Sequence, residues 1–310
     1  MTPTPSTGAT VGTTGPEGGA ASHRLGRVGI WAGGFDHLPA PEIRKAAAAV
    51  ENLGYGTLWF PETTGREAVA QAAILLSATR QITVAAGMTD IYARDPVTAA
   101  AAQRTLDEAY PGRFLLGLWD SHPSIAEDVR GHRFGPPAAT VRAYLDALDT
   151  APFGPPGPPA PPQRVLAALG PDLLALAAAR TRGATVLGMP SAYTRTARTV
   201  LGDDALLAVT QLCVLGHHPA DTADLARSTA AAALPNRREL LRGLGHRDPD
   251  ALDERLVDAL VAHGSAEDIA HRVQDHFDAG ADHVSLHVMT PAPHSPSVPQ
   301  WEQLARHLLV

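Results

Sequence analysis

Short apolar runs alternate with longer amphipathic segments along most of this chain. The runs are rich in Val, Leu, Ile and aromatic residues, which is typical of buried parallel strands. The predicted strands are 28–31, 57–60, 82–86, 114–118, 165–168, 185–187, 206–214 and 283–288. Strands that alternate with helices at this spacing predict a parallel sheet with right-handed crossovers. An open doubly wound sheet fits the pattern too, but about eight strands favour a closed (β/α)8 barrel.

Amphipathic segments fill the intervals between these strands. The predicted helices include 39–53, 67–79, 95–109 and a terminal helix at 301–309. Helical pattern also fills 219–243 and 252–278, so more than one helix precedes the last strand. We interpret this stretch as a helical insertion of the kind that forms a lid or a dimer surface in barrels.

Two segments are expected to lack regular structure. Residues 1–22 are rich in Thr, Gly, Pro and Ala and are predicted to form a disordered leader, followed by a single barrel domain over 23–310. Residues 151–162 are dominated by Pro and Gly and predict an extended loop. The leader has neither a basic start nor an apolar segment, so a signal peptide is not expected and the protein is predicted to be cytoplasmic.

Composition narrows the class of partner. The formal net charge of −7 gives no basic surface for nucleic acid or for an anionic membrane. No apolar run approaches the roughly 18 residues that a membrane-spanning helix needs. Cys213 is the only cysteine, which excludes an intramolecular disulfide and a cysteine-based metal cluster. A small-molecule substrate is therefore the expected partner.

Barrels keep their chemistry at the C-terminal ends of the strands, and three segments there carry polar groups. Residues 87–94 follow the third strand, so Thr89 and Asp90 are expected to expose hydrogen-bonding groups at the barrel mouth. The alternative is an ordinary loop in which Asp90 bonds its own backbone and Arg94 and Asp95 begin a helix.

The other two segments follow the fourth and second strands. His122 lies just beyond the fourth strand, where an imidazole can bind a ligand or transfer a proton near neutral pH. Glu62 ends the second strand and can act as a base in a partly dry site. An equally simple interpretation pairs Glu62 with a nearby arginine such as Arg66.

Several common kinds of site are not indicated. His283, Ser285 and His287 share one face of the last strand, but no carboxylate joins them by spacing, so no metal is expected. A P-loop, a Gly-x-Gly-x-x-Gly after a strand and a Gly-x-Ser-x-Gly elbow are all missing. A Rossmann-type dinucleotide site and a serine hydrolase are therefore not expected.

Six short motifs occur in a specific order along the chain. They are GYGTLWFPE at 54–62, YARDP at 92–96, AYPGRFLLG at 109–117, SH at 121–122, RVLAALG at 164–170 and AGADH at 279–283. In this order and spacing they resemble the luciferase-like monooxygenase superfamily, and more narrowly its branch that uses the deazaflavin coenzyme F420. The resemblance covers nearly the whole chain from about residue 27 to residue 290.

The resemblance implies a (β/α)8 barrel with an insertion, usually a homodimer, that binds a flavin or deazaflavin at its C-terminal mouth. The cofactor ring in such enzymes rests against a bulge after the third strand, often with a non-proline cis peptide. That bulge corresponds here to Gly87, Met88, Thr89 and Asp90, and Ser121 is expected nearby. The resemblance implies that backbone amides near Gly170, Gly188, Pro190 and Ser191 bind the cofactor phosphate, an arrangement that a helix N-terminus favours. Trp31, Trp59 and Trp119 are candidates for the apolar wall.

The chain departs from the family pattern in two places. Trp119 and Asp120 stand where the family usually has Gly and a small neighbour, and the loop after the sixth strand is shorter than usual. The leading hypothesis is an oxidoreductase that transfers a hydride between F420 and an organic substrate, with Glu62 and His122 protonating or orienting the substrate. One alternative is a monooxygenase that depends on flavin mononucleotide (FMN). The two departures favour a second alternative, a cofactor-free barrel with a binding or accessory role.

Overall fold

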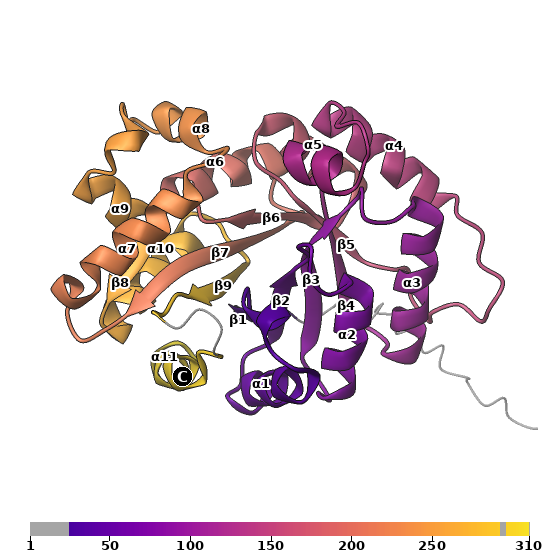
Figure 1. Cartoon of the computed structure of the whole chain (residues 1–310), viewed down its shortest axis with the longest axis horizontal. Helices are drawn as coiled ribbons and strands as arrows, with labels where there is room; N and C mark the ends of the chain where they lie inside the picture. Colours follow the sequence, from indigo (N-terminus) through magenta and orange to yellow (C-terminus); the bar gives the residue numbers. More distant parts are fainter. Residues whose placement is uncertain (1–24, 292–295, 310) are drawn as a thin grey trace, which may run out of the picture.

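A closed barrel of eight parallel strands forms the centre of the molecule (Figure 1). The computed structural model describes residues 25–291 and 296–309, so the expected leader at 1–22 lies outside the described residues. The ring runs from β1 through β6 in chain order, continues through β7 and β9, and closes where β9 pairs with β1. This arrangement confirms the predicted (β/α)8 barrel.

The strands lie close to the predicted runs. They are β1 Val28–Trp31, β2 Thr57–Pro61, β3 Thr83–Asp90, β4 Phe114–Trp119, β5 Arg164–Ala167, β6 Gly183–Leu187, β7 Leu206–Leu215, β8 Val261–Gly264 and β9 His283–Val288. The largest difference is in β3, which continues four residues beyond its predicted end. Gly87, Met88, Thr89 and Asp90 therefore belong to a strand and not to a loop.

Helices cover the outside of the barrel, and the four predicted at 39–53, 67–79, 95–109 and 301–309 are present with similar bounds. The helices are α1 Ala40–Asn52, α2 Ala68–Ser77, α3 Pro96–Ala109, α4 Pro137–Asp149, α5 Pro171–Arg180, α6 Ser191–Leu201, α7 Pro219–Ala233, α8 Arg238–Gly243, α9 Glu254–Leu260, α10 Ala266–Asp278 and α11 Val298–Leu308. Two 3₁₀ turns (η1 Phe35–His37 and η3 Pro249–Ala251) and a short π-helix (Ile125–Val129) complete the elements. None of the described helices is long and apolar enough to cross a membrane.

The helical insertion lies between β7 and β9, as predicted, but it contains a strand that the pattern did not predict. Residues 252–278 are not one helical stretch, because β8 separates α9 from α10. β8 pairs only with the end of β7, at Leu212–Leu215, and so lies outside the ring. In Figure 1 the insertion helices α7, α8 and α9 gather on the side of the barrel opposite α2 and α3.

Two apolar cores hold these layers. The outer core lies between the strands and the helices and includes Ile43, Leu75 and Leu116, each at most 1% exposed. The inner core fills the barrel and consists of Leu25, Trp31, Trp59, Ala85, Leu115, Val165 and Ala208. Trp31 and Trp59 stack with their ring centroids 6.4 Å apart. Trp59 is 1% exposed and packs the interior, whereas Trp31 lies at the end of β1 and reaches the barrel mouth.

Candidate functional site

A large cavity lies at the C-terminal ends of β3, β4, β5 and β6, where a barrel of this kind places its chemistry. Its volume is about 840 Å³, which falls in the range of cofactor and ligand pockets. Trp31, Met88 and Trp119 supply much of its apolar wall. The remaining lining residues include Asp120, Ser121, Phe134, Pro136, Leu169, Gly170, Pro171, Asp172, Leu173, Thr185, Leu187, Asn236 and Arg237.

A bulge in β3 shapes the floor of this cavity. Ala86 pairs with Leu116 but Thr89 pairs with Leu118, so β3 contains one residue more than its neighbour β4. An added Cβ on Gly87 would lie 2.6 Å from Trp31 and 2.8 Å from Trp59, so only glycine fits beneath the two indoles. The extra residue turns Met88 into the cavity. The predicted bulge is therefore present, but the expected cis peptide is not: every peptide bond in the described ranges is trans.

Thr89 and Asp90 do not expose polar groups at the barrel mouth, contrary to prediction. Each is 1% exposed, and neither lines the cavity. The Asp90 carboxylate accepts a hydrogen bond from the backbone N–H of Tyr92 at 2.8 Å and forms an ion pair with Arg130 at 2.8 Å. Asp95 caps α3 and Asp90 bonds nearby backbone, as the alternative expected, but residues 87–90 form a strand and not a loop. Both side chains are buried because β3 continues through them.

The Glu62 carboxylate also binds other groups of the protein. It forms a buried ion pair with Arg94 and accepts a hydrogen bond from the backbone N–H of Asp90 at 2.9 Å. The expected partner Arg66 instead donates to the carbonyl oxygens of Phe35 and Leu38. Because Glu62 is 5% exposed and lies away from the cavity wall, its position gives no support for proton transfer to a substrate.

Residues after β4 bring polar groups to the cavity. Ser121 has a left-handed φ of +70°, and its Oγ is buried without a hydrogen-bond partner among the described residues. Asp120 lines the same wall, and burial raises the pKa of its carboxyl to about 6, with the nearby Asp90 charge adding to the shift. His122 is half-buried beside the wall, and its Nδ1 lies 2.9 Å from Ser124 Oγ.

The predicted phosphate-binding glycines have specific backbone roles. Gly170 and Gly188 have φ values of +89° and +60°, a region that favours glycine. The N–H of Gly170 donates to the Tyr193 hydroxyl at 3.0 Å, and that of Gly188 donates to the Thr210 carbonyl at 2.9 Å. Gly170 lines the cavity, whereas Gly188, Pro190 and Ser191 lie outside its lining. Their role in cofactor binding stays a prediction.

One positive group on the cavity wall was missed by sequence reasoning. Arg237 lies between α7 and α8, and its guanidinium donates to the Leu187 carbonyl at 2.9 Å. Burial lowers its pKa to about 10, so it stays cationic at neutral pH. The dipeptide Pro235-Asn236 is a turn signal that breaks the predicted helix at 219–243, and it places Arg237 on the wall.

Two of the three polar residues on the inner face of β9, His283 and Ser285, form hydrogen bonds inside the barrel. His283 Nδ1 lies 2.8 Å from the Gly26 carbonyl, so it carries the proton, and Nε2 accepts a 2.9 Å hydrogen bond from Trp59 Nε1. Ser285 pairs with the hydroxyl of Thr210. Within 25–291 and 296–309, no three His, Cys, Asp or Glu side chains gather as a metal site would require. The absence of a metal from the chemistry of this protein stays a prediction.

Comparisons with known proteins agree with this architecture. A protein of Mycobacterium tuberculosis, provisionally named a coenzyme F420-dependent oxidoreductase, is 32% identical over 120 residues, which are 39% of this chain and 35% of that protein. The matched segment thus spans about a third of that relative's length.

Solved structures share the fold at low sequence identity. An F420-dependent secondary alcohol dehydrogenase with an F420–acetone adduct superposes with a TM-score of 0.70 at 14% identity, covering 91% of this chain and 97% of that one. The F420-dependent tetrahydromethanopterin reductase of Methanopyrus kandleri gives 0.68 at 15% identity, covering 91% and 98%. An FMN-bound Baeyer–Villiger monooxygenase component from Pseudomonas putida gives 0.67 at 14% identity, covering 90% and 96%.

A family model matches most of the described barrel. The model for luciferase-like monooxygenases matches residues 25–283, from the start of the described chain to the first residue of β9. The matched range includes β1 to β8 and every lining residue named above for the large cavity. The chain therefore belongs to the luciferase-like monooxygenase family.

Proposed function

We propose that this protein is an oxidoreductase that transfers a hydride between coenzyme F420 and a small organic substrate. The large cavity carries the proposal, because most of its lining residues are apolar, it lies beside the β3 bulge, and Asp120 and Arg237 add charged groups to its wall. The F420-related relatives reported above support the choice of cofactor. When bound, the deazaflavin supplies the two-electron hydride chemistry, and the protein supplies position and shelter from water.

The cavity wall fits a ring-bearing anionic cofactor. Met88, Trp31 and Trp119 provide apolar surface for the ring, and Ser121 lies on the same wall. Arg237 and the N-terminus of α5, which no side chain caps, provide positive potential for an anionic group. These groups face one cavity, so one ligand can contact all of them.

Proton transfer is best assigned to Asp120. Its carboxyl lines the cavity, and no ion pair of the described residues includes it. A pKa near 6 makes it able to give or take a proton close to neutral pH. His122 follows Ser121 and keeps Nε2 without a hydrogen bond among the described residues, so we retain it as a residue that orients the substrate.

Specific observations favour two other functions. The FMN-bound structural neighbour favours an FMN-dependent monooxygenase, which activates oxygen. The internally bonded amides of Gly170 and Gly188, together with the Asp120 charge, favour a cofactor-free barrel with a binding role.

Fluorescence titration of the purified protein with F420 and, separately, with FMN tests the proposal. Saturable micromolar binding of F420 with weaker binding of FMN supports it. Preferred binding of FMN with substrate-dependent oxygen consumption favours the monooxygenase. Binding of neither cofactor, with a folded protein confirmed by circular dichroism, overturns both redox functions.

A further inference from the structure

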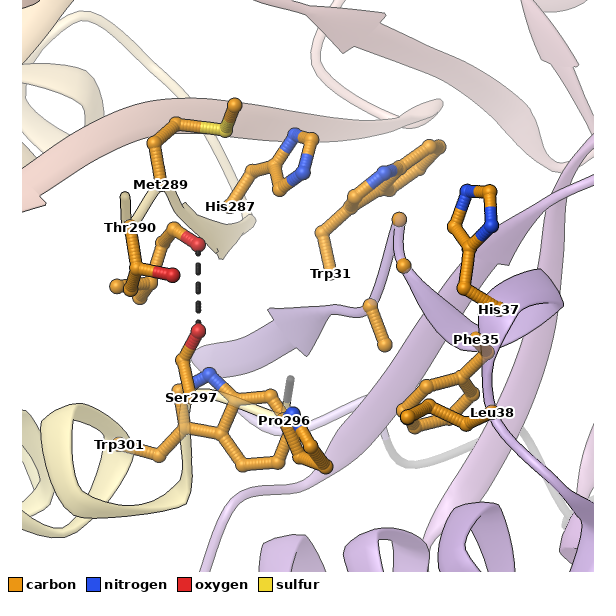
Figure 2. Close-up of a pocket in the computed structure, with 14 residues that line it drawn as sticks. Trp31, Phe35, His37, Leu38, His287, Met289, Thr290, Pro296, Ser297 and Trp301 are labelled. Carbon is orange, nitrogen blue, oxygen red and sulfur yellow. Dashed lines mark hydrogen bonds between the residues drawn. The ribbon is translucent and has the colours of Figure 1, made fainter. Parts of the chain in front are cut away.

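A second, smaller cavity adjoins the large one at Trp31. It has a volume of about 260 Å³ and lies between the ends of β1 and β9 and the start of α11 (Figure 2). Trp31 is the residue that lines both cavities. Figure 2 shows His287 and Trp31 next to each other on one side of this space, with Ser297 and Trp301 across from them.

The wall of the small cavity is neutral and largely apolar. Phe35, Leu38 and Trp301 are each at most 7% exposed and contribute apolar surface. None of its described lining residues is Asp, Glu, Lys or Arg, in contrast to the large cavity with Asp120, Asp172 and Arg237. A charged ligand would find no carboxylate, ammonium or guanidinium partner among these described residues, which favours a neutral ligand.

His287 gives this wall a hydrogen-bonding group that the protein does not use. Nδ1 is buried without a partner, and the ring makes no hydrogen bond to any described residue. Burial lowers the pKa of His287 to about 4, so at neutral pH its imidazole has one donor and one acceptor nitrogen. Gly33 lets the ring approach the β1 backbone, because an added Cβ would lie 2.8 Å from Nε2. Because Nδ1 has almost no exposed surface, a ligand in the small cavity would bond to the ring at Nε2.

We propose that the small cavity binds the organic substrate, and that this substrate is a neutral, mainly apolar molecule with one hydroxyl or carbonyl oxygen that hydrogen-bonds to His287. The assignment rests on the proposed function, since it places the substrate beside a cofactor in the large cavity. Trp31 lines both cavities, so a substrate in the small cavity lies beside the indole that also forms part of the cofactor wall. The volume is that of about nine water molecules at roughly 30 Å³ each, which suits a molecule of about ten non-hydrogen atoms.

Binding of 2-indanol to the cofactor-free protein, measured by isothermal titration calorimetry, tests the proposal. Indane lacks the oxygen, and indane-2-carboxylate adds a charge. Since one hydrogen bond changes affinity by about 2- to 12-fold, 2-indanol is expected to bind tighter than indane by that factor. The carboxylate is expected to bind more weakly than either. Equal affinity for 2-indanol and indane, or preferred binding of the carboxylate, would overturn the proposal.

Variants locate the binding site. His287→Leu is expected to reduce 2-indanol affinity to that of indane while F420 affinity stays unchanged. Leu38→Trp fills the small cavity and is expected to abolish binding of both probes. Its matched control is Leu173→Trp, which narrows the large cavity and is expected to leave probe binding intact. Loss of probe binding in Leu173→Trp but not in Leu38→Trp would place the substrate elsewhere.

The two proposals can fail separately in these measurements. Probe binding needs no cofactor, so selective binding of 2-indanol without F420 binding contradicts only the proposed redox function. F420 binding without oxygen-selective probe binding contradicts only the assignment of the small cavity. Thermal unfolding of each variant confirms that it is folded.

Discussion

Glu62 and Arg94 form a buried ion pair that holds the ends of β2 and β3 together. Their side chains are 4% and 7% exposed, and Arg94 Nη1 lies 3.0 Å from the Glu62 carboxylate. The same carboxylate accepts hydrogen bonds from the backbone N–H groups of Asp90 and Ala68. Glu62 thus fixes the end of β3 just beyond the bulge.

Glu62→Gln is expected to destabilise the protein. Removal of one charge leaves Arg94 buried without its main partner, which costs about 3–5 kcal/mol of unfolding free energy. Urea denaturation at pH 7 measures this loss. Glu67→Gln is the matched control, because Glu67 contacts the same guanidinium with a side chain that is 51% exposed, and its cost is expected to stay below about 1 kcal/mol. Unchanged stability with lost activity in Glu62→Gln would instead favour a catalytic Glu62.

Asp120→Asn is expected to stabilise the protein at alkaline pH. Because the folded-state pKa of about 6 exceeds the ordinary value of 3.8, the folded state binds more protons between these values. The wild-type stability therefore falls as the pH rises from about 4 to about 6, and stays lower above that range. With allowance for partial exposure, the variant is expected to gain about 1–2 kcal/mol at pH 7.5 and nothing at pH 4.

Urea denaturation at both pH values checks this expectation. Asp172→Asn is the control, because Asp172 lies on the same cavity wall but is exposed in the first turn of α5. It is expected to be neutral or slightly destabilised, since an acidic group favours a helix N-terminus. Identical pH dependence in wild type and Asp120→Asn would show that Asp120 titrates normally.

Gly87→Ala is expected to disturb the cavity floor. The new methyl group would overlap Trp31 and Trp59, at 2.6 and 2.8 Å, and overpacking of this kind costs about 1–3 kcal/mol. F420 affinity is expected to fall as well, because Trp31 lines the cavity. Gly154→Ala is the control, since nothing lies within 4 Å of its Cβ position. Thermal unfolding and F420 titration of both variants check this. Equal stability and equal F420 affinity of the two variants would mean that the indoles of Trp31 and Trp59 move aside without loss of stability.

The barrel could be predicted from the sequence because its strands are short apolar runs with clear turn signals. β8 could not, because Val261 and Ala262 extend the apolar periodicity of α9, and a short apolar run does not distinguish helix from strand. The capping box of Ser265 and Asp268, which begins α10, was the available signal for a break there.

The site could be predicted only in part. The position of the cavity at the strand ends follows from the fold, and Met88, Ser121 and Gly170 do line it. The burial of Thr89 and Asp90 was not predicted, because the apolar run ends at Ala86 whereas β3 continues through both residues. The ion-pair partner of Glu62 could not be predicted from the sequence either, since Arg66 is nearer to it in the sequence than its actual partner Arg94. Arg237 reaches the cavity wall from the helical insertion. Its position could not be predicted, because tertiary packing determines the path of the insertion.

The central claim is that F420 binds in the large cavity, and fluorescence titration of F420 into wild type, Leu173→Trp and Leu38→Trp tests it most directly. We predict micromolar binding by the wild type and by Leu38→Trp, and at least tenfold weaker binding by Leu173→Trp, whose indole would overlap the space that the cofactor needs in the large cavity. Equal F420 affinity in wild type and Leu173→Trp, or no binding by the folded wild type, would contradict the claim.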